Sequence, residues 1–263
     1  MHHLLNHPDL RKYFPIKAVR KFIKSLSTFW EASNQHEVEF STASPLRWDS
    51  DTQTIWQGMV KGEPILPRLC EYGAANLVSR IASASASITK SSLKPGLIFN
   101  GQAQMNRTDG YIQKLKRLAP LLSDSVDKLY EALSHIHQLF DNNQLFPIHG
   151  APHAHQWLDD GQRLGLVEFD RFSLGDRELD VATFLTELEW EGTVSSKFSQ
   201  LKEAFLSTYE SMTGPLIPTL LWAYRAHKYL ARACKASQRI SPDGEDRASN
   251  ALQKAFPIPS ILS

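Results

Sequence analysis

The segment from Phe146 to Ala182 concentrates side chains that can bind metals or move protons. It contains three histidines, His149, His153 and His155, followed by the carboxylates of Glu168 and Asp170. Imidazole and carboxylate groups together suit zinc or iron, and either group can serve as a general base. The histidines therefore predict either a metal-dependent hydrolase site or a loop whose shape they help to fix.

A β-hairpin should carry this chemistry. The stretch "HQWLDDGQRLGLVEF" has two apolar runs separated by Asp160-Gly161, a dipeptide typical of tight hairpin turns. Glu168 and Asp170 are two residues apart, so an extended strand would direct both toward the same face. Asp176 and Asp180 are expected to cap a helix that begins near Leu179 and to tie the histidine loop down by hydrogen bonds.

The flanking sequence predicts an α+β protein. Apolar spacing indicates a helix over 16–32, alternation a strand at Val38 and Phe40, and turn residues a hairpin over 45–60. A helix follows Pro67, the segment 89–109 is loop-like, and a second helix is expected with Ser125 as its N-cap. From Asp180 onward nearly every segment has helical spacing.

Composition excludes several classes of protein. The chain has 263 residues, a formal net charge of +1 and two cysteines that lie far apart in the sequence. No charge excess favours nucleic acid or a membrane surface as a partner. No apolar run reaches membrane-spanning length and no signal peptide is evident, so a cytoplasmic location is expected.

In the order of these motifs the chain resembles the aminoglycoside phosphotransferase and choline kinase group, whose members share a protein-kinase-like fold. "PLRWDSDTQTIWQGMVKGEPI" resembles the last N-lobe strands and the hinge, "IHGAPHAHQWL" the catalytic loop, and "LVEFDRFSLGDRELDVA" the metal-binding strand with the motif that follows it. The resemblance implies a shortened N-lobe over residues 1–61 and a large, mostly helical C-lobe with the catalytic-loop hairpin over 62–263.

The resemblance also implies site residues. His149 and His153 match the histidines of the catalytic loop, and Ala151 stands at the position of the catalytic Asp. Gln156 and Glu168 stand at the positions of the residues that would bind the Mg²⁺ of ATP. Each is one methylene longer than the family residue, and Asp170 is a substitute ligand. The hinge that would contact the nucleotide corresponds to a run of three residues, Gln57, Gly58 and Met59.

Two departures from the family pattern bear on activity. Ala151 cannot accept a proton, and loss of a general base typically costs about 10²–10⁴ in rate. The roughly fifteen residues before the first helix contain no glycine for a phosphate-binding loop, and neither Lys12 nor Lys17 is marked as the phosphate lysine.

Three hypotheses follow. The first is a degenerate kinase-like protein that binds a ligand or a protein partner. The second is an active ATP- and Mg²⁺-dependent kinase of a small-molecule hydroxyl substrate, with a displaced base at Glu168 or Asp170. The third is the metal-dependent hydrolase built on the three histidines. An acidic run at Glu187, Glu189 and Glu191 could also form a wall that attracts a cationic substrate, or simply a solvated helix end.

Overall fold

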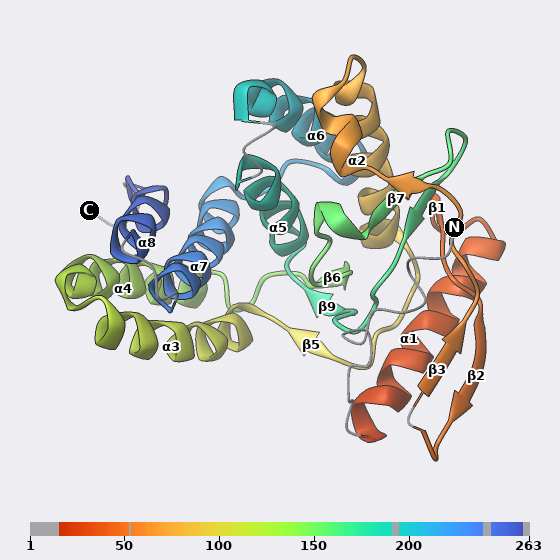
Figure 1. The fold of residues 1–263 in the computed structure, drawn as a ribbon, viewed down its shortest axis with the longest axis horizontal. Helices are drawn as coiled ribbons and strands as arrows, with labels where there is room; N and C mark the ends of the chain where they lie inside the picture. The colour runs from red at the N-terminus through yellow and green to blue at the C-terminus, as the bar shows by residue number, and fades with distance from the viewer. Residues whose placement is uncertain (1–15, 53, 191–194, 239–242, 260–263) are drawn as a thin grey trace.

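The computed structural model describes residues 16–52, 54–190, 195–238 and 243–259. Lys12 and Glu191 therefore lie outside the described residues. Figure 1 shows α1 and the β2–β3 hairpin at one end of the molecule and α3, α4, α7 and α8 at the other. The strands around β7 and β9 lie between these two groups. In the described part of the chain no helix combines the length and the hydropathy needed to cross a membrane.

The N-terminal part is a helix followed by short strands, as the apolar spacing predicts. The hairpin turn is stabilised by Asp49, whose carboxylate accepts hydrogen bonds from the backbone N–H groups of Asp51 and Thr52. Trp56 is 54% exposed on this hairpin. The elements are α1 (Ile16–Asn34), β1 (Phe40–Ser41), β2 (Pro45–Asp49), β3 (Thr54–Gln57) and β4 (Glu63–Pro64).

The predicted turn at Asp160-Gly161 joins β7 (Trp157–Asp159) to β8 (Leu164–Leu166). These strands form the centre of a sheet with the order β1-β8-β7-β4. A second sheet has the order β5-β9-β6, with β5 (Ile98–Phe99), β6 (Phe146–Ile148) and β9 (Ser173–Gly175). The two sheets bracket the segment 149–156, which lies between β6 and β7 in sequence.

Most of the chain is helical, and one helix departs from the sequence-based expectation. The segment 89–109, expected to be loop, contains the first half of α3 (Gly101–Leu118). Asn100 caps it by accepting a hydrogen bond from the N–H of Ala103 at 3.1 Å. Gly101 is required by packing, because a Cβ there would collide with the ring of His137. His137 is itself buried.

The remaining helices follow the predicted order. Ser125 is not an N-cap, since α4 begins two residues earlier, at Ser123. Helix α5 likewise begins at Arg177, two residues before the expected start. The elements are 3-10 helix η2 (Leu66–Cys70), α2 (Ala74–Lys90), η3 (Pro120–Leu122), α4 (Ser123–Leu139), η4 (Ala154–Gln156), α5 (Arg177–Trp190), η5 (Ser195–Lys197), α6 (Phe198–Thr213), α7 (Pro218–Ser237) and α8 (Gly244–Gln253).

Two hydrophobic clusters fill the described part of the molecule. One lies among α1, α2, α6 and the β7–β8 hairpin and contains Phe29, Trp157 and Phe169. The other lies among α3, α4, α7 and α8 and is rich in alanine and leucine. Helix α5 contributes to both, through Phe184 to the first and Leu179 to the second. Because α5 packs against both clusters, its position relative to the segment 149–156 is fixed.

Candidate functional site

The His149–Gln156 loop is anchored by one carboxylate on α5. Asp180 accepts hydrogen bonds from the backbone N–H of His149 at 2.7 Å and of Gly150 at 2.8 Å. Burial raises the pKa of Asp180 to about 7, against the effect of these two hydrogen bonds and of the charge of Lys228. Asp180 thus ties the loop to the helix, as the sequence predicted. The side chain of Asp176 accepts instead from Asn143 and from the hydroxyl of Tyr224.

The backbone conformation of Gly150 fixes the position of Ala151. Gly150 has φ +85°, a conformation that favours glycine, and a Cβ there would collide with the backbone of Arg171. The loop therefore packs directly against the chain that follows Asp170. Ala151, at the position expected for the catalytic Asp, is 4% exposed, so its methyl group is buried.

The three histidines do not form a metal centre. His149 is fully buried, its Nε2 lies 3.3 Å from the carbonyl of Val167, and burial lowers its pKa to about 3. His153 instead directs Nδ1 toward Glu187 at 3.5 Å, and His155 is exposed. Within the described residues no group of three or more His, Cys, Asp or Glu side chains could hold a metal ion.

Gln156 and Glu168 are brought together, and they bind each other. Nε2 of Gln156 donates to Oε2 of Glu168 at 2.8 Å. Oε1 of Gln156 accepts from the backbone N–H of His153 at 2.8 Å, in a capping box that starts η4. These two bonds fix the orientation of the amide, because a carboxylate accepts and an N–H donates. Both polar ends of Gln156 are therefore engaged within the protein.

Asp170 lies in a turn rather than on the expected strand. β8 ends at Leu166, and Glu168 has φ +69°, so the chain is not extended between the two carboxylates. Phe169 anchors this turn by stacking on Phe29 with ring centroids 4.3 Å apart. Glu168 and Asp170 are both exposed. Burial lowers the pKa of Lys21 on α1, and the negative charge of nearby Asp170 opposes that shift.

These donors do not fit a magnesium ion held as the fold would imply. Mg²⁺ needs short oxygen contacts in near-octahedral geometry. The only oxygen of the Gln156 side chain already accepts a backbone N–H, and its amide nitrogen faces the Glu168 carboxylate that would share the ion. In this arrangement the amide nitrogen, rather than the amide oxygen, faces the carboxylate that would share the ion.

The three residues expected to contact a nucleotide lie at the end of the N-terminal hairpin. Gln57 is the last residue of β3, and Met59 is 88% exposed. The N–H of Gly58 donates to the carbonyl of Ser44 at 2.8 Å, and a Cβ at Gly58 would collide with the Ser44 hydroxyl. Gly58 therefore keeps the chain close to the preceding strand as it leaves the hairpin.

The acids on α5 do not form the acidic wall considered from the sequence. Glu187 is paired with Arg232 at 2.6 Å, and Glu189 with Arg225 at 2.6 Å and Lys254 at 2.9 Å. The partners come from α7 and from the residue that follows α8. Local sequence could not reveal this neutralisation, since the arginines are about forty residues away.

The cleft beside the His149–Gln156 loop is instead lined by basic residues, which the sequence reading did not identify. It measures about 520 Å³. Basic residues recur at helical spacing in two segments of the sequence. They are Arg107 and Lys114, with Tyr111 between them, on α3, and Lys228, Arg232 and Lys235 on α7. Treating 89–109 as a loop concealed the first of these segments. The lining residues are Arg107, Tyr111, Lys114, His153, Arg171, Glu187, Lys228, Ala231, Arg232, Cys234, Lys235 and Gln238.

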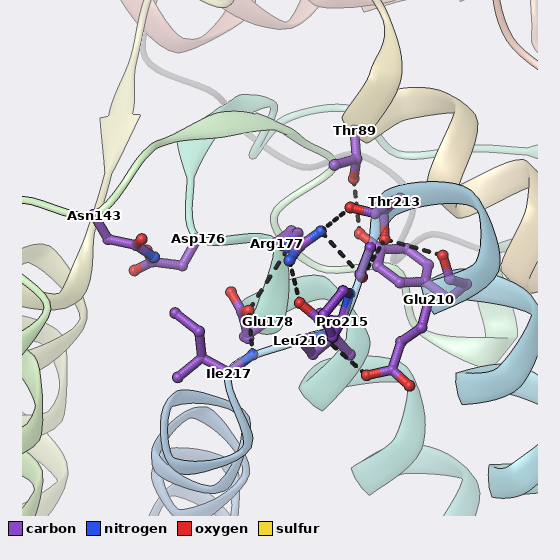
Figure 2. A network of polar contacts seen from close by, with 12 residues as sticks. Thr89, Asn143, Asp176, Arg177, Glu178, Glu210, Thr213, Pro215, Leu216 and Ile217 are labelled. Carbon is purple, nitrogen blue, oxygen red and sulfur yellow. Dashed lines mark hydrogen bonds and ion pairs between the residues drawn. The ribbon is translucent and has the colours of Figure 1, made fainter.

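Arg177 fixes where α7 begins relative to α5. Its guanidinium donates to the carbonyls of Thr213, Gly214 and Pro215, which form the connection between α6 and α7 (Figure 2). Glu178 accepts from the N–H of Ile217 at 3.0 Å at the start of α7. The first turn of α5 thus holds both the His149–Gln156 loop, through Asp180, and the helix that carries half of the basic cleft.

Comparison with known proteins identifies the fold. No family model matches the chain, and no curated protein matches it. Its structure is similar to a choline/ethanolamine kinase family protein from Mesorhizobium loti, with TM-score 0.61, 15% identity and coverage of 89% of this chain and 77% of that one. Choline kinase LicA from Streptococcus pneumoniae gives TM-score 0.60, 15% identity and coverage of 92% and 82%.

A third similar structure is the GDP and kanamycin complex of APH(2")-IIia, with TM-score 0.63, 12% identity and coverage of 92% and 84%. These identities are low, so the likeness concerns the fold. It confirms the α+β architecture that the order of motifs indicated, with a small N-terminal lobe and a large helical C-terminal lobe that carries the hairpin loop. The chain therefore has the protein-kinase-like fold of the choline kinase and aminoglycoside phosphotransferase structures.

Proposed function

We propose that this protein is a degenerate kinase-like protein that binds a small-molecule ligand in its C-terminal lobe and does not transfer phosphate. The observation that carries this proposal is the combination of an intact loop scaffold with a missing base. Asp180 holds the backbone of His149 and Gly150, and Gly150 keeps its positive φ, yet the next residue presents a buried methyl group.

Chemistry supports this reading. Phosphoryl transfer on this fold depends on an oriented nucleophile and on cations that neutralise the phosphate oxygens. Ala151 can neither accept a proton nor orient a hydroxyl group. Gln156 and Glu168, which match the metal ligands in sequence, satisfy each other by a direct hydrogen bond. The base is thus absent, and the two residues expected to bind the metal ion bond to each other instead.

The scaffold still offers a binding site. The cleft of about 520 Å³ lies against the His149–Gln156 loop, since His153 is part of its lining and Arg171 packs on Gly150. A volume of this size is within the usual range for small-molecule sites. A protein that binds or senses a ligand needs a ligand site but no catalytic base.

The test is a phosphotransfer assay with ATP and Mg²⁺ against amino alcohols and amino sugars, carried out on the unaltered protein and on the Glu168→Ala variant. We expect both to consume ATP at the same background rate. The proposal fails if the unaltered protein phosphorylates a substrate, and loss of that activity in Glu168→Ala would identify Glu168 as the base. Such a result would support the alternative, a hydroxyl kinase with a displaced base.

A further inference from the structure

The basic cleft, defined by Arg107, Lys114, Arg171, Lys228, Arg232 and Lys235, is unusual in its charge. Among the residues that the structure describes, these six cationic side chains line one concave space with a single carboxylate, that of Glu187. The formal net charge of the whole chain is only +1. The cleft is therefore a local concentration of positive charge on a protein whose charges nearly balance overall.

The carboxylate of Glu187 is already occupied. It lies 2.6 Å from Arg232 and 3.5 Å from Nδ1 of His153. Although burial opposes the shift, His153 and Arg232 lower the pKa of Glu187 to about 2, so it is ionised at neutral pH. Arg232 is held further by stacking on Trp190, 4.7 Å from the ring centroid. Glu187 and Arg232 thus form a closed pair on one wall.

The other five cations have no carboxylate partner. Among the described residues, none of these side chains forms an ion pair within 4 Å or donates a hydrogen bond to a carboxylate, in contrast to Arg225, which bonds Glu189. The five residues concerned are Arg107, Lys114, Arg171, Lys228 and Lys235.

Mutual repulsion acts among three of these groups, Arg107, Arg171 and Lys228. Burial lowers the pKa of Lys228 to about 7, the charges of Arg171 and Arg107 lower it further, and the charges of Glu187 and Asp180 oppose the shift. Burial likewise lowers the pKa of Arg171 and Arg107 adds to that effect, whereas Asp170, Tyr111 and Glu168 oppose it. Unpaired, partly desolvated cations carry a free-energy cost that an anion would remove.

The walls that carry these side chains are rigid. Arg107 lies next to Thr108, whose hydroxyl is 2.7 Å from Nδ1 of His227 in the interior between α3 and α7. His227 in turn lies next to Lys228, and its Nε2 is 2.8 Å from Nε2 of His137 on α4. These contacts hold the basic residues of α3 and α7 in fixed relative positions. Cations that are already in place bind an anion without the free-energy cost of assembling the site.

We propose that the basic cleft binds a small molecule that carries a phosphate ester or a polyphosphate group. This inference rests on the proposed function, since it names the class of ligand for the binding site described there. Guanidinium groups match the oxygen geometry of phosphate, and lysines add point charges around it. A concave site on a chain of net charge +1 favours a compact multivalent anion over a long nucleic acid.

Titration calorimetry with inorganic tripolyphosphate, without ATP or metal and at constant ionic strength, tests the proposal. Arg107→Gln and Lys235→Gln should each weaken binding at least tenfold. The matched control is Arg117→Gln, which removes the same charge from an exposed position of α3 outside the cleft lining. It should stay within twofold of the unaltered protein. Thermal unfolding of each variant verifies that it is folded.

Several results would overturn the proposal. They are absence of binding, equal loss in Arg117→Gln, equally tight binding of citrate, which carries only carboxylates, and tighter binding of a single-stranded oligonucleotide through the same side chains. The outcome is independent of the phosphotransfer assay. If that assay finds catalysis while tripolyphosphate binding depends on Arg107 and Lys235, the proposed function is wrong and the ligand class stands.

Discussion

The side-chain amide of Gln156 donates a hydrogen bond of 2.8 Å to the carboxylate of Glu168. The resemblance to the kinase family led us to expect metal ligands at these two residues, and in the structure they bind each other. Their contact explains why restoring a single missing group is not expected to restore catalysis.

Ala151→Asp tests this point. We expect no ATP turnover above that of the unaltered protein, because the new carboxylate would find no cation bound by Gln156 and Glu168. Placing a carboxylate at a position that is 4% exposed should also lower the free energy of unfolding by about 1–3 kcal/mol. The measurements are a phosphotransfer assay and urea unfolding. Turnover produced by this one substitution would mean that the remaining site is competent.

Lys228→Met should make the protein more stable in the absence of anions. It removes a cation whose pKa is lowered to about 7 by burial and by Arg171 and Arg107. Because the folded-state pKa lies below the ordinary value of 10.5, the charged lysine destabilises the fold below about pH 7, and this cost disappears as the pH rises toward 10.5. We expect a gain of about 1–2 kcal/mol at pH 6.5.

Urea unfolding at pH 6.5 and at pH 10 measures that gain, which should shrink at the higher pH. Arg117→Gln serves as a control, because its exposed side chain should change stability little at either pH. A loss of stability in Lys228→Met at pH 6.5 would contradict the view that the charge of Lys228 destabilises the fold.

Glu187→Gln should affect stability and anion binding in opposite directions. It breaks the pair with Arg232 and should lower the free energy of unfolding by about 1–3 kcal/mol at pH 7. Because the folded-state pKa of Glu187 is about 2, its stabilising effect is present above about pH 4.5 and is lost as the pH falls toward 2. Unfolding of the two proteins across this range should therefore converge at low pH.

In the same variant tripolyphosphate should bind several-fold more tightly, since the cleft loses the one carboxylate among its described lining residues and Arg232 becomes available. Calorimetry measures this directly. Unchanged or weaker binding would show that Arg232 does not face the ligand.

Asp159→Asn should weaken the attachment of β7 to the surrounding helices. Its fully buried carboxylate is paired with Arg68 on η2 and with Arg80 on α2, the latter at 3.0 and 3.1 Å. We expect a loss of about 2–4 kcal/mol, because two guanidinium groups lose their shared counterion. Asp160→Asn is the control. Its exposed side chain accepts from the N–H groups of Gln162 and Arg163, an Asn oxygen can do the same, and stability should change little.

Arg177→Met should loosen the connection between α6 and α7. It leaves the carbonyls of Thr213, Gly214 and Pro215 without the guanidinium that binds them (Figure 2). We expect a loss of about 2 kcal/mol or more in unfolding free energy. Arg247→Met removes an exposed pair at 3.7 Å with Asp243 and should cost about 0.5 kcal/mol or less. Similar losses in both variants would argue against a special role for Arg177.

The sequence by itself determined the features that depend on neighbouring residues. The Asp160-Gly161 turn fixed the β7–β8 hairpin, because few dipeptides adopt that turn, and the apolar spacing of 16–32 placed α1. The order of motifs indicated the kinase-like fold. Helix α3 was missed because Pro95, Gly96, Asn100 and Gly110 suggest a loop, whereas Asn100 caps the helix and Gly101 admits the ring of His137.

Only the tertiary structure decided the character of the site. Charge on α5 suggested an acidic wall, but Arg232 and Arg225 reach Glu187 and Glu189 from α7 and neutralise it. The cations of the cleft come from α3, from α7 and from Arg171, far apart in the chain. A sequence pattern records which side chains share one helix face, whereas the sign of a cleft depends on which faces the packing brings together.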